Sequence, residues 1–201
     1  MNSKKPDYPI NSLILKRWSP RAMSGEPVTK NDLMAIFEAA RWAPSSYNNQ
    51  PWKFIYAMRE TPEWNTLFNL LVEFKQSWCK NAAVLIVIIS KNNFDFNNKN
   101  SRTHSFDSGA AWENIALQAT HMNLVSHGME GFDYYRAKKE LGIPDDFTVE
   151  AMCAIGKQGK KENLPEELQA KEIQSDRKPI TEFVFHERSE ERRVGKECRS
   201  R

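Results

Sequence analysis

The sequence lacks the features that mark several large classes of protein. Its longest apolar run, at 82–89, has eight residues, far short of the roughly 18 that a membrane span requires. Cys79, Cys153 and Cys198 form no CxxC pair, which argues against a disulfide framework and a zinc site. The first residues include lysines but no apolar segment, so we expect no secretory signal. The expected location is therefore the reducing cytoplasm.

Several catalytic motifs are also missing. The chain has no GxGxxG segment after a predicted strand, no GxSxG turn, and no P-loop spacing in the GKQGKK segment at 156–161. No histidine has a metal-ligand partner at helical spacing, and we expect each of them at the surface or at a helix cap. They are His104, His121, His127 and His186. The sequence thus predicts neither a metal site nor a serine hydrolase.

The apolar content that is present is enough for one folded domain. Of the 201 residues, 40% are hydrophobic and 11% aromatic, with 6 tryptophans and 11 phenylalanines. Disordered chains of this length carry few such residues, and a chain of this size buries a substantial core. We therefore expect a single domain over residues 1–187.

The net charge of +3 resides in the last residues of the chain. From Arg188 onward there are six basic and three acidic residues, so residues 1–187 are neutral overall. The segment 188–201 has no apolar period, and we expect it to lie outside the fold, either as a non-native extension or as a disordered tail. A basic nucleic-acid-binding module is the alternative, and the neutral body of the chain argues against it.

The periodicity of apolar residues predicts helices mixed with a few strands. Helices are expected at 10–16, from a Thr29 cap to Pro44, from Thr61 through Phe74, and at 108–126. A further short helix is expected to end at Gly142, because Pro144 follows two residues later. Strands are expected at 54–58, at 83–90 and at 148–155, the second of them buried on both faces. This order predicts an α+β or α/β domain with one small sheet.

The segment Arg17-Trp18-Ser19-Pro20-Arg21 has the composition of an anion receptor. Because Pro20 disfavours helix at Ser19, the segment is expected to be extended, so that residues 17, 19 and 21 point the same way. Two guanidinium groups and a hydroxyl on one edge suit a phosphate group. An exposed helix exit with two surface arginines is the alternative interpretation.

A second polar segment lies at 44–52, PSSYNNQPW, between two prolines. Its Ser46, Asn48 and Gln50 alternate along one edge. Hydroxyl and amide groups both donate and accept hydrogen bonds, which suits a ring edge that mixes carbonyl, N–H and ring nitrogen. An ordinary polar loop is the alternative, because Ser and Asn are common turn residues.

Taken together, these segments resemble the FMN-dependent nitroreductase family. RWSPR followed by AARWAPSSYNNQPWKF is similar to the N-terminal signature of that family. The segment HGMEGFD at 127–133 is similar to its PxxGFD turn, and Arg177-Lys178-Pro179 resembles its C-terminal phosphate-binding motif. The four blocks occur in order over about 17–185 and so cover nearly the whole body of the chain.

The resemblance implies a fold and an activity. The fold is α+β, a three-layer sandwich with a small central mixed sheet flanked by helices, and it forms a homodimer with two FMN sites at the subunit interface. FMN is held tightly without a covalent bond, and NAD(P)H is a transient co-substrate. The implied enzyme reduces nitroaromatics, quinones or related electrophiles by a ping-pong mechanism, with no catalytic side chain. No nucleic acid or membrane partner is implied.

The resemblance also carries over cofactor-binding residues. Arg17, Ser19, Arg21 and Arg177 match positions that hold the FMN phosphate and nearby ring atoms. Trp18, within the same motif, is expected to contribute mainly its backbone. The C-terminal motif often has a second basic residue two positions before the arginine, where this chain has a serine. Phosphate affinity is therefore expected to depend more on the N-terminal pair.

Two further groups match positions at the flavin ring. The loop expected to reach the flavin of the other subunit contains Ser45, Ser46 and Asn48. The turn whose backbone N–H is expected to face flavin N5 contains Met129, Glu130 and Gly131. Many members also place an Asn near the end of the third helix, where this chain offers Lys75 or Gln76.

Other functions on the same fold stay open at this point. One is a non-redox flavin-binding protein with the same FMN residues. Another is a specialised relative that carries out dehalogenation, flavin destruction, or enoyl or aldehyde reduction. Oxidation of NAD(P)H with a quinone or a nitroarene separates the first of these from a reductase.

Overall fold

The computed structural model describes residues 4–186 of the chain. The described part divides into two compact units. The larger unit is Asn11–Gln174, and the smaller one holds the described residues of Met1–Ile10 and Ser175–Arg201. The expected tail at 188–201 lies outside the described residues.

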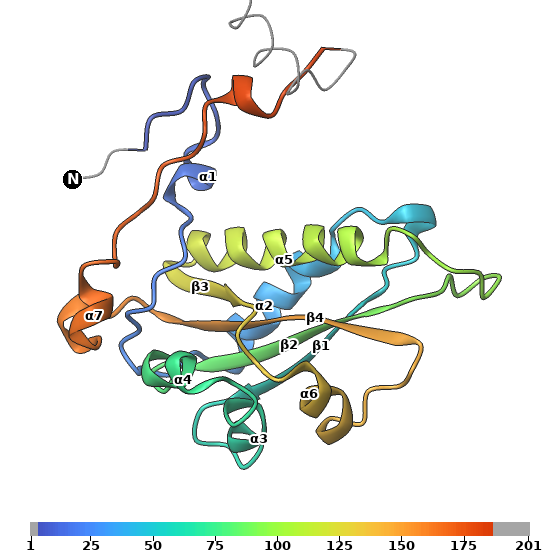
Figure 1. The fold of residues 1–201 in the computed structure, drawn as a ribbon, viewed down its shortest axis with the longest axis horizontal. Coiled ribbons are helices and arrows are strands. Elements are labelled where there is room, and N and C mark those ends of the chain that lie inside the picture. The colour runs from blue at the N-terminus through green and yellow to red at the C-terminus, as the bar shows by residue number, and fades with distance from the viewer. Residues whose placement is uncertain (1–3, 187–201) are drawn as a thin grey trace, which may run out of the picture. The chain divides into compact units, whose positions relative to one another are not determined.

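The larger unit is built on a four-stranded sheet with the strand order β1-β2-β4-β3 (Figure 1). The strands are β1 (Trp52–Met58), β2 (Val84–Lys91), β3 (Leu124–Met129) and β4 (Phe147–Lys157). Each neighbouring pair is antiparallel, and a bulge interrupts the β2–β4 register between Ile88 and Ile89. The expected α+β class is confirmed, while these pairings are antiparallel rather than mixed.

Strand β2 runs through the centre of the core, as its uninterrupted apolar sequence predicts. Its residues from Val84 to Ser90 are all buried. β-Branched side chains pack well on both faces of a pleated sheet that is covered on both sides. The burial of this strand fixes the sheet as the middle layer.

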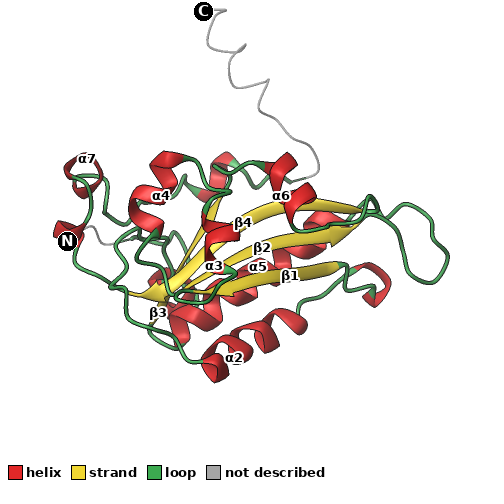
Figure 2. Ribbon diagram, turned by 90° about the horizontal axis from the view of Figure 1, so that it is seen from below, coloured by secondary structure: helices red, strands yellow, loops and turns green. Residues whose placement is uncertain are grey.

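Helices cover both faces of the sheet (Figure 2). Helices α2 (Lys30–Arg41) and α5 (His104–His121) lie on one face, where Ile36 and Ile115 join the core with Ile86. Helices α3 (Trp64–Phe68), α4 (Glu73–Cys79) and α6 (Tyr134–Glu140) lie on the other, where Trp78 packs in a second cluster with Met152. The three-layer arrangement is therefore confirmed.

The remaining elements are short. The larger unit also contains α1 (Ser12–Lys16), α7 (Glu166–Gln169) and the 3-10 turns η1 (Ser46–Asn48) and η2 (Lys161–Asn163). The smaller unit contains the 3-10 turn η3 (Ile180–Glu182), whose first backbone N–H donates to the Asp7 carboxylate at 2.8 Å. Over residues 4–186, no helix has the length and apolar character needed to cross a membrane.

Two predicted helix boundaries are confirmed by their caps. The Thr29 hydroxyl accepts the backbone N–H of Asp32 at 3.1 Å and so caps α2. After α6, Gly142 adopts a φ of 61°, which favours glycine, and the Ile143 N–H donates to the Lys138 carbonyl at 3.0 Å. This pattern ends the helix where the Gly and the following Pro predict.

Two predicted helices are wrong in their extent. The third helix is broken into α3 and α4, because the chain between them forms a bridge from Leu71 to Phe132. The long helix starts earlier than 108, at His104, and ends at His121. Asn123, with a φ of 57°, turns the chain there, so that the segment after it forms β3 instead. Neither change follows from apolar periodicity, because both depend on pairing with distant segments.

We expect the buried strand β2 to control stability. Ile86 is 0% exposed, so Ile86→Ala leaves a cavity and lowers the free energy of unfolding by about 2–5 kcal/mol. Urea unfolding measures this change, with the slope against urea concentration unaltered. The exposed Lys53 on the neighbouring strand is the control, and Lys53→Ala is expected to stay within about 0.5 kcal/mol of the parent. Equal effects of the two substitutions would contradict the central place of β2.

Candidate functional site

The segment that follows α1 presents Arg17 and Ser19 on one edge. The backbone of Arg17 is extended, with φ −61° and ψ 128°, as expected for this segment. Its Nη1 donates to the Ser19 hydroxyl at 3.3 Å, and its Nε lies 3.8 Å from the Glu113 carboxylate on α5. A guanidinium and a hydroxyl group thus lie together, beside the long helix.

Arg21, at the end of the same segment, is held by a buried carboxylate. Glu172, only 8% exposed, accepts the backbone N–H groups of Arg21 and Ala22 at 2.7 and 2.8 Å. Its second oxygen lies 3.7 Å from Arg21 Nη1. Among the described residues, the buried Nε of Arg21 has no hydrogen-bond partner. The guanidinium is therefore oriented by Glu172, and its Nε is not satisfied within the described part of the chain.

His127 on β3 holds the same segment from the other side. It is buried, so the expectation of a surface or cap position is wrong for this histidine. Its Nδ1 lies 3.1 Å from the Pro20 carbonyl, and because a carbonyl only accepts, Nδ1 carries the proton. Burial lowers the pKa of His127 to about 4, helped by the positive charges of Arg21 and Lys75 and opposed by the bond to Pro20. His127 is thus neutral at pH 7 and close to both cations.

Lys75 on α4 lies against the turn that ends β3. A Cβ at Gly131 would come within 2.9 Å of the Lys75 side chain, so glycine leaves room for that side chain. The neighbouring Gln76 directs its amide nitrogen to the carbonyls of Phe68 and Leu71, at 3.3 and 3.0 Å. Of the two candidates on this helix, Lys75 is therefore the one whose side chain borders the turn.

A cavity of about 540 Å³ lies on the far side of that turn. Its walls include the predicted turn residues Met129 and Glu130, together with Trp112 from α5 and Tyr134 from the start of α6. A Cβ at Gly128 would lie 3.1 Å from the Trp112 ring, so this glycine lets the ring approach the strand. The cavity is therefore open to a flat molecule between an aromatic helix face and the sheet.

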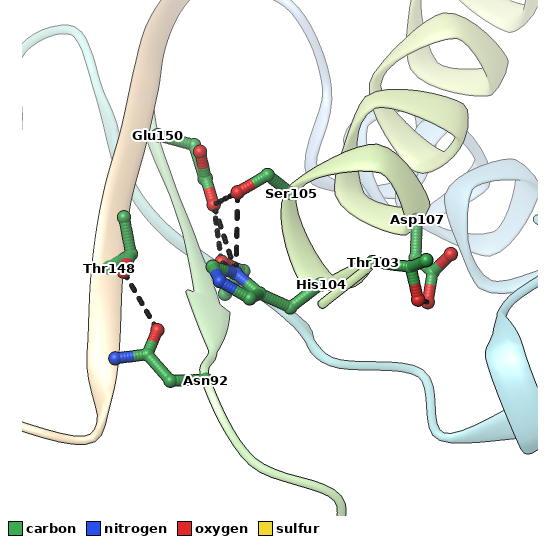
Figure 3. Close-up of polar contacts among 8 residues, drawn as sticks. Asn92, Thr103, His104, Ser105, Asp107, Thr148 and Glu150 are labelled. Carbon is green, nitrogen blue, oxygen red and sulfur yellow. Dashed lines mark hydrogen bonds and ion pairs between the residues drawn. The ribbon is translucent and has the colours of Figure 1, made fainter. Parts of the chain in front are cut away.

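One end of the cavity carries a cluster of polar side chains that the sequence did not reveal. Figure 3 shows Glu150 on β4 facing His104 and Ser105 at the start of α5. The Ser105 hydroxyl donates to Glu150 Oε1 at 2.8 Å, and the buried Ser90 hydroxyl donates to the same oxygen. His104 Nδ1 lies 2.7 Å from the Ser90 hydroxyl. These residues come from three separate segments, so no local motif marks them.

The loop with Ser45, Ser46 and Asn48 is anchored near the start of α5. The backbone N–H of Ser46 donates to the buried Asp107 carboxylate at 3.0 Å. Asp107, which lies beside Thr103 in Figure 3, was not predicted from the sequence. The backbone N–H of Gln50 donates to the Ser45 hydroxyl at 3.0 Å. Asn48 has a φ of 53° and Gln50 a φ of 50°, which cost free energy in residues other than glycine. Strain of this kind is typical of ligand-binding loops.

The other predicted residues are placed as follows. Trp18 is half-buried within the Arg17–Arg21 segment. Arg177 belongs to the smaller unit, where its Nη1 donates to the backbone carbonyls of Ser175 and Asp176 at 3.1 and 3.0 Å. The structure thus brings the N-terminal arginines, Lys75 and the turn of β3 to neighbouring positions.

The chain is similar to known proteins along most of its length. A model of the family described as the nitroreductase family matches residues 14–157. A Bacillus subtilis protein that carries the name of an NAD(P)H nitroreductase, MhqN, is 25% identical, over 84% of this chain and 94% of that protein. An Archaeoglobus fulgidus protein, named as an NADH dehydrogenase/NAD(P)H nitroreductase, is 28% identical over 72% of this chain and 82% of its own length.

Solved structures are similar in fold. An oxidoreductase described as containing FMN is 43% identical, with a TM-score of 0.90 over 94% of this chain and 96% of that chain. A nitroreductase-type protein of Desulfovibrio desulfuricans in complex with FMN is 24% identical, with a TM-score of 0.69 over 91% of this chain and 99% of its own. The second likeness is one of fold alone.

The buried state of His127 predicts a dependence of stability on pH. In the unfolded chain a histidine has a pKa near 6.5, whereas burial lowers the pKa of His127 in the folded chain to about 4. The unfolded state therefore binds a proton that the folded state does not. As the pH falls from 6.5 to 4, His127 is expected to remove about 3 kcal/mol from the free energy of unfolding.

The measurement compares urea unfolding of the parent and His127→Asn at several pH values. Asn keeps a donor for the Pro20 carbonyl but does not titrate, and the contribution of carboxylates cancels in the difference. The variant is expected to be less stable at pH 7 and to lose less stability toward pH 4. Parallel profiles of the two proteins would show that His127 is not buried as a neutral group.

Proposed function

Because the chain belongs to the nitroreductase family, we propose that it is an oxidoreductase that binds FMN and uses NAD(P)H to reduce nitroaromatics, quinones or related electrophiles. The observation that carries this proposal is the arrangement at the end of β3. A cationic edge with Arg17 and Arg21 lies on one side, and a cavity of about 540 Å³ lies beside the turn. Such an arrangement suits a cofactor with an anionic group and a flat ring.

The residues present fit FMN. The unpartnered Nε of Arg21 and the guanidinium of Arg17 beside Ser19 are charge-assisted donors of the kind that bind phosphate. Gly128 and Gly131 allow close approach of other groups to the backbone at the turn. When bound, FMN supplies the hydride chemistry, and the protein supplies binding, orientation and electrostatics.

Each group of residues has a proposed role toward that cofactor. Arg17, Ser19 and Arg21, with the backbone of Trp18, hold the phosphate and the nearby ring edge. The backbone of Met129, Glu130 and Gly131 faces the reactive edge of the ring. Lys75 stabilises negative charge at the pyrimidine edge, and Gln76 is the alternative donor there.

We propose a ping-pong order, in which NAD(P)H and the electron acceptor enter the cavity in turn. The sequence has no dinucleotide-binding fingerprint, which fits a nicotinamide that binds transiently as a substrate. Trp112 and Tyr134 on the walls offer flat apolar surfaces on which conjugated rings stack. No side chain is needed as an acid or base for the hydride step.

We also propose a homodimer. The strained loop with Ser45, Ser46 and Asn48 is useful to a flavin only if it reaches the flavin of another subunit. Phe106, next to the Asp107 that anchors this loop, is 79% exposed. A large exposed aromatic side chain beside a binding loop suits the core of a subunit interface. The acceptor is a small molecule, and the proposal involves no nucleic acid and no membrane.

The first test of the function is FMN retention after Arg17→Ala and Arg21→Ala are combined. Each lost charge-assisted contact costs roughly 1.5–3 kcal/mol, so FMN affinity is expected to fall by a factor of about 100 or more. Equilibrium dialysis of FMN measures this, with circular dichroism to check folding. A matched double variant, Arg41→Ala with Arg136→Ala on exposed faces of α2 and α6, is expected to bind FMN normally. Unchanged affinity in the first variant would refute the site.

The second test is the assembly state. Sedimentation velocity is expected to show a species of about twice the 23.3 kDa chain mass. Phe106→Glu places a charge in the proposed interface and is expected to shift the protein toward the monomer and lower its FMN content. An active, FMN-loaded monomer at assay concentration would contradict the proposed role of the loop.

A further inference from the structure

The cavity beside the turn has walls of one charge sign. Two of its lining residues are the acids Glu130, on the β3–α6 turn, and Glu150, on β4. Among the described residues that line it, there is no lysine, arginine or histidine. The cationic edge with Arg17 and Arg21 is separate, because neither arginine lines the cavity. The two regions of the site therefore favour ligand groups of opposite charge.

The Glu150 carboxylate is fixed in place rather than free to swing into solvent. Its Oε1 accepts hydrogen bonds from the Ser90 and Ser105 hydroxyls, and His104 Nδ1 lies 3.5 Å from it (Figure 3). No hydrogen bond within the described residues uses its Oε2. A carboxylate held on one oxygen keeps the other available to accept a hydrogen bond from a ligand.

A second feature of the cavity also indicates a ligand. Ser108 on α5 is only 2% exposed and lines the cavity, and its hydroxyl has no hydrogen-bond partner in the described part of the chain. A buried hydroxyl without a partner costs free energy unless a ligand or a water molecule forms a hydrogen bond with it. Ser108 therefore provides a neutral hydrogen-bonding point that is independent of the carboxylates.

Tyr134 lines the same cavity as the two carboxylates. Burial raises the pKa of its phenol, and the negative charges of Glu130 and Glu150 raise it further. The ring of Tyr134 therefore lies within the field of both acids. The cavity thus combines an aromatic wall, two carboxylates and a buried hydroxyl around one volume of about 540 Å³.

We propose that this cavity selects electron acceptors that carry a cationic or hydrogen-bond-donating group, and that it discriminates against acceptors with an anionic group. Glu150 receives the donor group, Glu130 adds to the negative field, and Ser108 completes a hydrogen bond to the ring substituents. The proposal rests on the function proposed above. It also suits the nicotinamide, whose amide donates hydrogen bonds and whose ring is positively charged after hydride loss.

The test uses three 1,4-naphthoquinones that differ in one substituent: a quaternary ammonium, a methyl or a sulfonate group. Their dissociation constants from the oxidised holoprotein are measured calorimetrically without NAD(P)H, and kcat/KM is measured separately. Because a unit charge near a partly buried carboxylate interacts by several RT, the ammonium probe is expected to bind at least about tenfold more tightly than the sulfonate probe.

Three variants assign the effect to residues. Glu150→Gln is expected to reduce the ammonium-over-sulfonate preference about tenfold, with the methyl probe changed less than about threefold. Glu130→Gln removes the second charge without disturbing the Ser90 cluster and is expected to act in the same direction. Ser108→Ala is expected to weaken all three probes by about three- to tenfold, because it removes a hydrogen bond and no charge. The control, Glu162→Gln, makes the same charge change at an exposed position outside the cavity and is expected to leave the preference unaltered.

The possible outcomes distinguish a failure of this inference from a failure of the proposed reductase function. Absence of a preference in the parent protein, or a preference that survives both cavity variants, would overturn the inference while leaving the reductase intact. An equal loss in the Glu162 variant would do the same, since it would reveal a general field effect. Failure to bind FMN, or to reduce any of the three quinones with NAD(P)H, would overturn the proposed function instead.

Discussion

The position of the edge strand β3 controls the geometry of the whole site. Its backbone pairs with β4 from Leu124 to Met129. This pairing positions a structural contact, a cavity wall and the turn that follows the strand. His127 bonds the Pro20 carbonyl and so holds the arginine-bearing segment. Gly128 admits the Trp112 ring that forms a cavity wall, and the strand then ends in the turn with Glu130. A slip of one residue in the β3–β4 register would move the side chain of each β3 residue to the opposite face of the sheet and so disrupt these contacts.

The site separates charge of opposite sign over a short distance. Burial keeps His127 neutral, so the positive charge beside it belongs to the neighbouring Arg21 and Lys75. On the other side of the strand end, the cavity has two carboxylates and no described cation. A field of this kind orients a molecule that is anionic at one end and neutral or cationic at the other, before any specific contact is made. By this arrangement, a chain that is neutral over most of its length presents regions of opposite charge to a ligand.

Much of this architecture could be predicted from local signals. The Thr29 cap, the glycine after α6 and the apolar run of β2 each specify their element within a few residues, and the ordered motifs identified the family. What escaped prediction depends on distant pairs. Glu172 meets Arg21 across 151 positions, and Ser46 meets Asp107 across 61, so neither has a sequence signature. The break between α3 and α4 likewise comes from the bridge to Phe132 rather than from the residues of the helix.

Three of the polar residues that escaped prediction have one property in common, which bears on the chemistry. Glu172, His127 and Asp107 are buried, and each bonds backbone groups of a predicted binding segment. Buried charged and polar groups are costly unless they are satisfied, so their retention indicates that the position of those segments matters. This is what a reaction carried by a bound cofactor requires, since the protein contributes placement and field. It also fits the lack of acid, base or nucleophile motifs in this sequence: these three buried groups position backbone, and the reacting atoms belong to the ligands.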